Sequence, residues 1–350
     1  MQYLFDNNGI IYHREPCSFN KYTEKELLKY AVGANLYMPA TQSNIFPKMI
    51  DNPYRIGSMT LCLEDSIRPE MLEEAEGCLL SLLDQLYQSI QSGQGGLVPL
   101  IFVRVRDYQQ FQNFTKLLNK ERLSVLCGFN FPKFNSENGR AYFETLKSLV
   151  DQYKEPLYGM PILEDERVMH KETRYLELSQ IQMILQEYND YVLNIRVGAT
   201  DFSSLFGLRR GVNTTIYEVM PVVDCLTDIL NYFLRNYGHY IISGPVWEYY
   251  SWDENSLEIK GLVRELERDM QCGFHGKTII HPSQSLAVNK INVVKYDEYQ
   301  DAKSILAAEG GVFAGYYGNK MNEVNPHRSW AEKIMSKAKI FGIAHKKYTL

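Results

Sequence analysis

The chain has 350 residues, and its 37 Lys and Arg against 42 Asp and Glu give a formal net charge of −5. This slightly acidic balance argues against a nucleic-acid binder, because phosphate binding normally requires a basic excess. No stretch approaches the roughly 20 apolar residues of a membrane span, and the N-terminus lacks the basic start and apolar run of a signal peptide. We therefore expect a cytoplasmic protein without a nucleic-acid or membrane partner.

Short apolar runs recur along the chain and predict eight strands. Each run is almost continuously apolar, which is typical of parallel strands that are buried on both faces. The predicted strands cover residues 34–40, 59–66, 97–106, 123–133, 157–164, 192–202, 239–247 and 276–282.

Amphipathic segments separate these runs and predict helices. Apolar residues follow a 3.6-residue period from Met71 to Leu86, and similar patterns cover 175–185, 216–234 and 257–270. Strands that alternate with helices form right-handed crossovers and a parallel sheet. Eight such units favour an α/β fold of the closed (β/α)8 TIM-barrel type, and an open doubly wound sheet is the alternative.

Two segments lie outside this repeat. Residues 1–33 form an N-terminal leader with a short helix at 23–31, residues 34–295 form the barrel, and residues 296–350 form a C-terminal helical extension. Within the extension, helices at 297–309 and 329–341 flank a glycine-rich turn, and we expect it to act as a lid or a dimerisation arm. The six cysteines are scattered singly without close Cys or His pairs, which predicts reduced thiols and no zinc site.

Charged residues follow most of the predicted strands. Such residues are costly at the ends of buried strands unless they meet an opposite charge, a metal or a ligand. In parallel α/β barrels the active site lies at these C-terminal strand ends. A purely structural ring of ion pairs is the alternative. The strand-end residues are Glu64-Asp65, Arg104, Arg106, Pro132-Lys133, Glu164-Asp165, Asp201 and His281-Pro282.

Three of these residues suggest a specific chemistry. Glu164 and Asp201 supply hard oxygen ligands of the kind that Mg²⁺ prefers. Arg104 suits a substrate carboxylate, which it can bind through two parallel hydrogen bonds. A metal and an arginine together can hold a 2-oxo or 3-hydroxy acid and stabilise an enolate while a carbon–carbon bond breaks.

At these residues the sequence resembles a known family, the HpcH/HpaI aldolases with the citrate lyase beta subunit and malyl-CoA lyase. The matching pieces occur in order from about residue 34 to 340, nearly the whole chain. They are LYMPATQ at 36–42, LCLEDSI at 61–67, FVRVR at 102–106, FPKF at 131–134, PILE at 161–164, VGATDF at 197–202, GFHGKTIIHPSQ at 273–284 and NPHRSWAEKIMSKA at 325–338.

The resemblance implies roles for the strand-end residues. Arg104 would bind the substrate carboxylate, Glu164 and Asp201 would bind Mg²⁺ or Mn²⁺, and Glu64 and Asp65 would complete the catalytic site. The family also implies a homo-oligomer. For Lys133 we expect a contact with a substrate carboxylate or phosphate, or an ion pair with Glu64 or Glu164, in preference to the Schiff base of a class I aldolase.

The sequence departs from the family pattern at three places. Cys62 replaces the first aspartate of the family's Asp-Leu-Glu-Asp strand end, and a long charged loop, DERVMHKE, follows Glu164. Val324 stands where the acyl-CoA lyases carry an acid/base aspartate, with Glu323 as a neighbouring substitute. Val324 argues against a CoA thioester, the charged loop suggests a different substrate, and Cys62 leaves the acids Glu64 and Asp65 of the metal site in place. Together the residues resemble the divergent branch of the family that accompanies bacterial tellurium-resistance genes.

The leading hypothesis is a Mg²⁺-dependent carbon–carbon lyase or aldolase that acts through an enolate on a small carboxylate substrate, as a free acid or a CoA thioester. A barrel that has lost this chemistry and serves as a binding or assembly component is the second hypothesis. A metal-dependent enzyme for a phosphorylated or nucleotide-like substrate near Arg209 and Arg210 is the third, although adjacent loop arginines more often form a solvated face. GFHGKT at 273–278 lacks the spacing of a nucleotide-binding P-loop.

Overall fold

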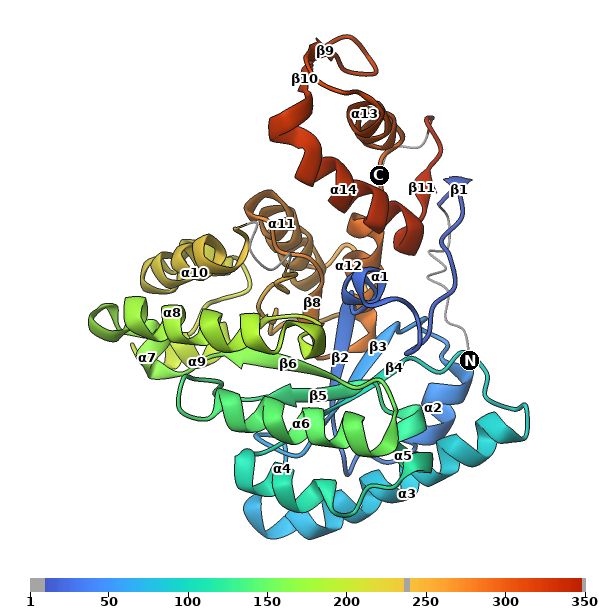
Figure 1. Ribbon diagram of the computed structural model, residues 1–350, viewed down its shortest axis with the longest axis vertical. Coiled ribbons are helices and arrows are strands. Elements are labelled where there is room, and N and C mark those ends of the chain that lie inside the picture. The colour runs from blue at the N-terminus through green and yellow to red at the C-terminus, as the bar shows by residue number, and fades with distance from the viewer. Residues whose placement is uncertain (1–9, 236–239, 348–350) are drawn as a thin grey trace.

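The centre of the molecule is a parallel β-sheet. The computed structural model describes residues 10–235 and 240–347. Seven strands lie side by side in the order β7-β6-β5-β4-β3-β2-β8, and the sheet is curled (Figure 1). The strands are β2 (Ala34–Pro39), β3 (Ser58–Cys62), β4 (Leu100–Arg104), β5 (Gly128–Phe131), β6 (Tyr158–Leu163), β7 (Arg196–Val197) and β8 (Lys277–Ile279).

An eighth, irregular strand closes the sheet into a barrel. Parallel bridges join Ile195 to Ile242 and Gly244 to Lys277, so residues 241–244 stand between β7 and β8. The backbone N–H of Ser243 donates to the carbonyl of Ile195 at 2.9 Å, and that of Gly244 to the carbonyl of Gly276 at 3.0 Å. The predicted TIM barrel is therefore confirmed, and its predicted seventh strand is reduced to isolated bridges.

Helices cover the outside of the barrel, as the alternation in the sequence predicted (Figure 1). The predicted amphipathic face at 71–86 belongs to a helix whose Ala75, Leu79, Leu82, Leu83 and Leu86 are buried. The helices are α2 (Ile45–Asp51), α3 (Leu72–Gln91), α4 (Tyr108–Thr115), α5 (Lys120–Val125), α6 (Gly139–Tyr153), α7 (Glu166–Met169), α8 (Lys171–Glu187), α9 (Ala199–Ser204), α10 (Met220–Phe233), α11 (Leu257–Cys272) and α12 (Ser285–Asn292), with the 3-10 turns η1 (Pro69–Met71), η2 (Asn189–Tyr191), η3 (Ile216–Glu218) and η4 (Pro282–Gln284).

Several predicted element boundaries were wrong. The strand predicted at 123–133 begins at Gly128, because Asn119 caps helix α5 by accepting the backbone N–H of Arg122. The strand predicted at 192–202 ends at Val197, and Asp201 lies in the first turn of α9. The helix predicted at 216–234 is interrupted at Val219, just before Pro221 in the first turn of α10. Pro is tolerated there because the N–H groups of a first turn have no partner inside the helix.

The two ends of the chain pack together at one end of the barrel. Strand β1 (Tyr12–Arg14) pairs with β11 (Ile343–Ala344), and α1 (Lys25–Ala31) packs against α14 (Val324–Phe341). The ring of Phe341 lies 5.5 Å from that of His275, two residues before the start of β8. The C-terminal extension therefore covers the N-terminal strand ends. The domain boundaries at residues 33 and 295 stay a prediction.

The rest of the C-terminal extension is a helix and a hairpin. Helix α13 (Tyr296–Ala307) packs on α14, and β9 (Val312–Ala314) pairs with β10 (Met321–Glu323) (Figure 1). The predicted glycine-rich turn is thus the bend of this hairpin, and the last helix begins five residues earlier than predicted. All six cysteines are free, as predicted.

The barrel interior is polar, which the sequence reading missed. Side chains at alternate positions of a strand point to the same face. The inward positions carry a hydrogen-bonded chain in which Asn35 donates to Ser58 at 2.9 Å and accepts from Thr60 at 2.7 Å. Asn130 donates to Tyr37 and to Thr60. These polar residues form the floor below the C-terminal strand ends.

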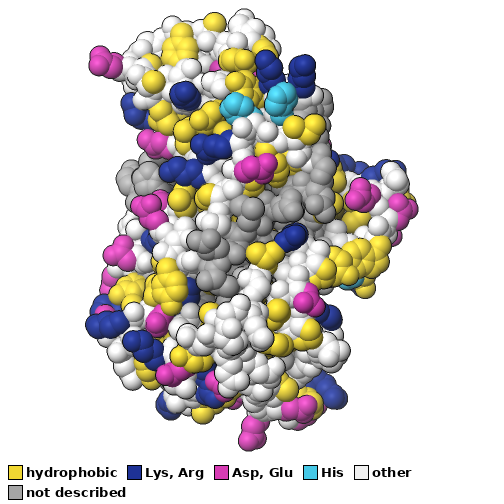
Figure 2. Space-filling view, turned by 90° about the vertical axis from the view of Figure 1, so that its right-hand side faces the viewer, with side chains coloured by type: hydrophobic (Ala, Val, Ile, Leu, Met, Phe, Trp, Pro, Cys, Tyr) yellow, Lys and Arg dark blue, Asp and Glu magenta, His cyan; other side chains and the backbone are white. Residues whose placement is uncertain are grey.

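The charge distribution and the helices of the described chain bear on possible partners. On the face in Figure 2 the acidic and basic side chains are interspersed, without a basic stripe. Within residues 10–235 and 240–347, no helix combines the length and the apolar character that crossing a bilayer requires.

Candidate active site

A cavity of about 320 Å³ opens at the C-terminal ends of the barrel strands. Four of the six predicted site residues line it, namely Asp65, Arg104, Glu164 and Asp201. The other two, Glu64 and Lys133, contact Arg104 and Glu164 from outside the cavity. The remaining lining residues are Tyr37, Met38, Pro39, Cys62, Ser66, Ile162, Arg196, Val197, Gly198, Thr200, Val246, Thr278 and Ile280.

Arg104, the last residue of β4, is the centre of a cluster of ion pairs. Its guanidinium contacts Glu64 at 2.7 Å, Asp65 at 3.3 Å and Glu164 at 3.2 Å. Burial alone would lower the pKa of Arg104, but Glu164 and Glu64 raise it above its usual value. Three protein carboxylates therefore already oppose the charge of this arginine.

Lys133 reinforces the same cluster. Its ammonium contacts Glu64 at 2.9 Å, and its backbone N–H donates to Glu164 at 3.0 Å. The residue has a φ of 45°, a left-handed backbone conformation that a non-glycine residue rarely adopts. Although burial opposes it, the hydrogen bond to Glu64 raises the pKa of Lys133. A Schiff-base lysine needs a lowered pKa, so this environment argues against that role.

Glu164 follows β6 and lies deep in the cluster. The residue is only 5% exposed. Burial raises the pKa of its carboxyl to about 7, Asp201 adds to this rise, and Arg104 opposes it. Gly198 makes room for the carboxylate, since a Cβ at that position would stand 2.3 Å from Oε2 of Glu164.

Asp201 reaches the cavity from α9. Burial also raises the pKa of its carboxyl, while Lys133 opposes the rise. In the part of the chain that the structure describes, no side-chain cation lies within ion-pair distance of this carboxylate. Of the four predicted acids, Asp201 is therefore the one without an ion-pair partner.

The charges of this cluster do not balance. Glu64, Asp65, Glu164 and Asp201 supply four negative charges against the two positive charges of Arg104 and Lys133, a formal excess of −2. Across residues 10–235 and 240–347, no three His, Cys, Asp or Glu side chains are placed to share one ion. Glu164 and Asp201, two carboxylates within a cluster of formal charge −2, fit a divalent cation that keeps part of its water shell.

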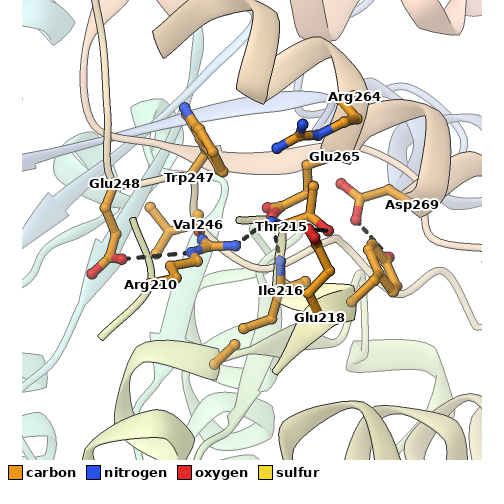
Figure 3. A network of polar contacts seen from close by, with 12 residues as sticks. Arg210, Thr215, Ile216, Glu218, Val246, Trp247, Glu248, Arg264, Glu265 and Asp269 are labelled. Carbon is orange, nitrogen blue, oxygen red and sulfur yellow. Dashed lines mark hydrogen bonds and ion pairs between the residues drawn. The ribbon is translucent and has the colours of Figure 1, made fainter. Parts of the chain in front are cut away.

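A second, largely buried charge network lies beside the cavity (Figure 3). Arg210 pairs with Glu265, donates to the carbonyl of Val246, and lies over the ring of Trp247. Lys277 contacts Glu265 at 2.9 Å and Asp269 at 2.7 Å. The prediction that both adjacent arginines form a solvated face was wrong for Arg210, and Arg209 is exposed.

This network fixes the loop that follows α9. Glu265 accepts the backbone N–H of Ile216 at 2.8 Å, and Tyr217 donates its hydroxyl to Asp269 at 2.7 Å. The loop is thereby tied to α11 and to the first residue of β8. With Lys277 held by two acids, the motif at 273–278 leaves no lysine for a nucleotide phosphate.

His281 is a predicted strand-end residue whose contacts in the structure are local. Its Nδ1 lies 2.8 Å from the hydroxyl of Ser283 and accepts the backbone N–H of that residue, which caps η4. Its ring stacks on Tyr250 at 4.2 Å. His281 does not line the cavity. It therefore packs and caps locally.

Tyr37, Arg196 and Gly198 are among the cavity residues that the sequence analysis did not predict. Tyr37 and Arg196 point inward from β2 and β7, each two residues after an inward asparagine. The alternation Asn35, Tyr37 and Asn194, Arg196 is a period of two within the apolar runs, and it was the available signal. No sequence pattern marks Gly198, because a glycine is needed there only to make room for Glu164, which is distant in sequence.

Comparison with known proteins identifies relatives of the chain. A family model described as C–C bond lyase of the TIM-barrel fold matches residues 26–343. A comparison with curated proteins found no match.

Solved structures show the same fold at low sequence identity. The protein CitE from Mycobacterium tuberculosis, in complex with magnesium, acetoacetate and coenzyme A, has a TM-score of 0.58 at 20% identity, over 89% of this chain and 99% of that chain. RipC from Yersinia pestis has a TM-score of 0.50 at 17% identity, over 75% and 95%. The citrate lyase beta subunit from M. tuberculosis has a TM-score of 0.50 at 19% identity, over 75% and 97%.

Proposed function

The chain belongs to the C–C bond lyases of the TIM-barrel fold, and from this premise we propose that it is a Mg²⁺-dependent lyase or aldolase for a small carboxylate substrate. The observation that carries the proposal is the cavity at the strand ends, where Glu164 and Asp201 face Arg104 within a cluster of net charge −2. Carbon–carbon lyases need a group that neutralises the enolate oxygen as the bond breaks.

Glu164 and Asp201 are the residues that would hold the metal. Their carboxylate oxygens suit Mg²⁺, and Mn²⁺ shares this preference for hard oxygen ligands. Burial raises the pKa of both carboxyls, and a neighbouring acid adds to each rise, Asp201 for Glu164 and Asp65 for Asp201, so a bound cation would favour their charged forms. When bound, the metal supplies Lewis acidity toward the oxygens of a 2-oxo or 3-hydroxy acid.

The remaining residues of the cluster position the substrate. Arg104 offers its guanidinium to a carboxylate at the cavity wall. Glu64 and Asp65 orient that guanidinium through their ion pairs, and Lys133 holds Glu64 in place. The cavity volume of about 320 Å³ is at the small end of the usual range for ligand sites, which suits a small acid.

We propose a free acid as the substrate. The CitE structure contains magnesium, acetoacetate and coenzyme A, and Mg²⁺ with a small acid suits this cavity. Val324 supplies no carboxylate at the position of the acyl-CoA acid/base residue, and Arg210, a candidate partner for a phosphate, is neutralised by Glu265. A homo-oligomer stays a prediction.

The test measures turnover of a panel of 2-oxo and 3-hydroxy acids, each as free acid and as CoA thioester, with Mg²⁺ and with EDTA. Wild type should cleave at least one free acid only with Mg²⁺. Glu164→Gln and Asp201→Asn should abolish that turnover and leave the fold intact by circular dichroism.

The matched control is Glu187→Gln, which alters an exposed acid that pairs with Arg140 and should leave turnover unchanged. Full turnover in both cavity variants would refute the assignment. A wild type that binds neither Mg²⁺ nor any acid would favour the second hypothesis, a barrel that serves as a binding or assembly component.

A further inference from the structure

Arg196 is a buried cation at the floor of the candidate active site. It is the first residue of β7, is 1% exposed, and is one of the residues that line the cavity. Removing a guanidinium from water is costly unless an opposite charge compensates it. The question is therefore which group balances Arg196.

The groups around this guanidinium are neutral. It donates to the hydroxyl of Thr278 and, at 3.4 Å, to that of Ser243, and its carbon lies 5.8 Å from the ring centre of Tyr37. Its Nε has no hydrogen-bond partner. Burial accordingly lowers the pKa of Arg196, and no Asp or Glu opposes this effect.

The other buried arginines of the described chain are all paired with acids. Arg104 contacts Glu64, Asp65 and Glu164; Arg174 contacts Asp224 and Asp228; and Arg210 contacts Glu265 (Figure 3). Within residues 10–235 and 240–347, Arg196 is the buried arginine without a carboxylate in ion-pair distance. It is also the one at the cavity floor.

We propose that Arg196 binds an anionic group of the substrate, so that the substrate is a small acid with a second negative charge besides the group held at the metal and Arg104. This inference rests on the proposed function. Tyr37 and Thr278 also line the cavity, and their hydroxyls can donate hydrogen bonds to the same anion. Because Arg104 already faces three carboxylates, Arg196 is the uncompensated cation of the cavity.

The experiment compares two acids of equal length by calorimetric titration of the Mg²⁺-loaded protein. Oxaloacetate and 2-oxobutyrate differ only in that a carboxylate of the first replaces the terminal methyl of the second. Wild type should bind oxaloacetate at least tenfold more tightly. Arg196→Met should lose this preference and retain wild-type affinity for 2-oxobutyrate, and Arg196→Lys should retain part of the preference.

A purely structural role would give a different result. The control Arg174→Met removes a buried but acid-paired arginine of α8 and should leave the preference unchanged. Arg196→Met should melt no lower than wild type, because it removes an unpaired charge. Equal binding of both acids by wild type, or an unchanged preference in Arg196→Met, would overturn the role of Arg196 alone. Failure of both acids to bind would overturn the proposed function together with it.

Discussion

Gly198 leaves room for Glu164, and its replacement by alanine should displace the carboxylate of Glu164 by a distance that the structure lets us estimate. A Cβ there would stand 2.3 Å from Oε2 and 2.5 Å from Cβ of Glu164. Carbon and oxygen atoms without a bond between them approach to about 3.5 Å, so the carboxylate must move by about 1 Å. A displacement of about 1 Å in a reacting group can cost about 100-fold in rate.

We therefore expect Gly198→Ala to lower turnover about 100-fold and to weaken Mg²⁺ binding by about 10- to 100-fold. Overpacking should cost about 1–3 kcal/mol of folding free energy, so the protein stays folded. Calorimetric titration with Mg²⁺ and thermal unfolding measure the two effects separately.

The matched control is Gly77→Ala in the middle of α3, where a Cβ would meet nothing within 4 Å. It should gain about 0.5–1 kcal/mol of stability through helix propensity and keep full activity. Wild-type Mg²⁺ affinity in Gly198→Ala would show that Glu164 is not held where we place it.

Two further predictions concern buried charges. Arg210→Met leaves Glu265 with Lys277 alone and should cost about 3–5 kcal/mol, which lowers the melting temperature by about 4–7 °C for a chain of this size. Scanning calorimetry measures this change, and the double variant Arg210→Met/Glu265→Gln should recover part of the lost stability. A double variant less stable than Arg210→Met would contradict the stabilising role of this ion pair. Burial lowers the pKa of Lys337 to about 8, so between pH 8 and 10.5 the unfolded chain binds the proton that the folded chain has lost, and stability rises with pH. Lys337→Met should therefore be more stable than wild type at pH 7 by up to about 3 kcal/mol, and its advantage should be smaller at pH 10. Urea unfolding of both proteins at the two pH values measures this difference in stability. A difference that does not change with pH would refute the lowered pKa of Lys337.

The sequence was sufficient to predict the barrel and to bring most of the site together. Charged residues directly after apolar runs lie on one face of a parallel barrel even when strand boundaries are off by several residues. This is why Glu64, Arg104 and Glu164 were found. Asp201 was also found, although it lies in α9 and not on a strand, because α9 begins only two residues after β7.

The remaining features depend on partners that are distant in the sequence. Arg210 can be buried because it forms an ion pair with Glu265, which lies 55 residues further along the chain. No local sequence pattern predicts that pairing. Arg196 was read as part of an apolar strand, since a continuous run hides the polar positions that face the barrel interior. That no acid pairs with Arg196 becomes visible only in the folded structure, where its neighbours in the cavity are known.

The central claim is that Glu164 and Asp201 bind a divalent cation together with a small acid. The most direct measurement is calorimetric titration of Mg²⁺ into wild type, Glu164→Gln and Asp201→Asn, each with and without a saturating 2-oxo acid. Our account predicts that wild type binds Mg²⁺ more tightly in the presence of the acid and that both variants lose this coupling. Metal binding that is absent from wild type, or that is equal in all three proteins, would contradict it.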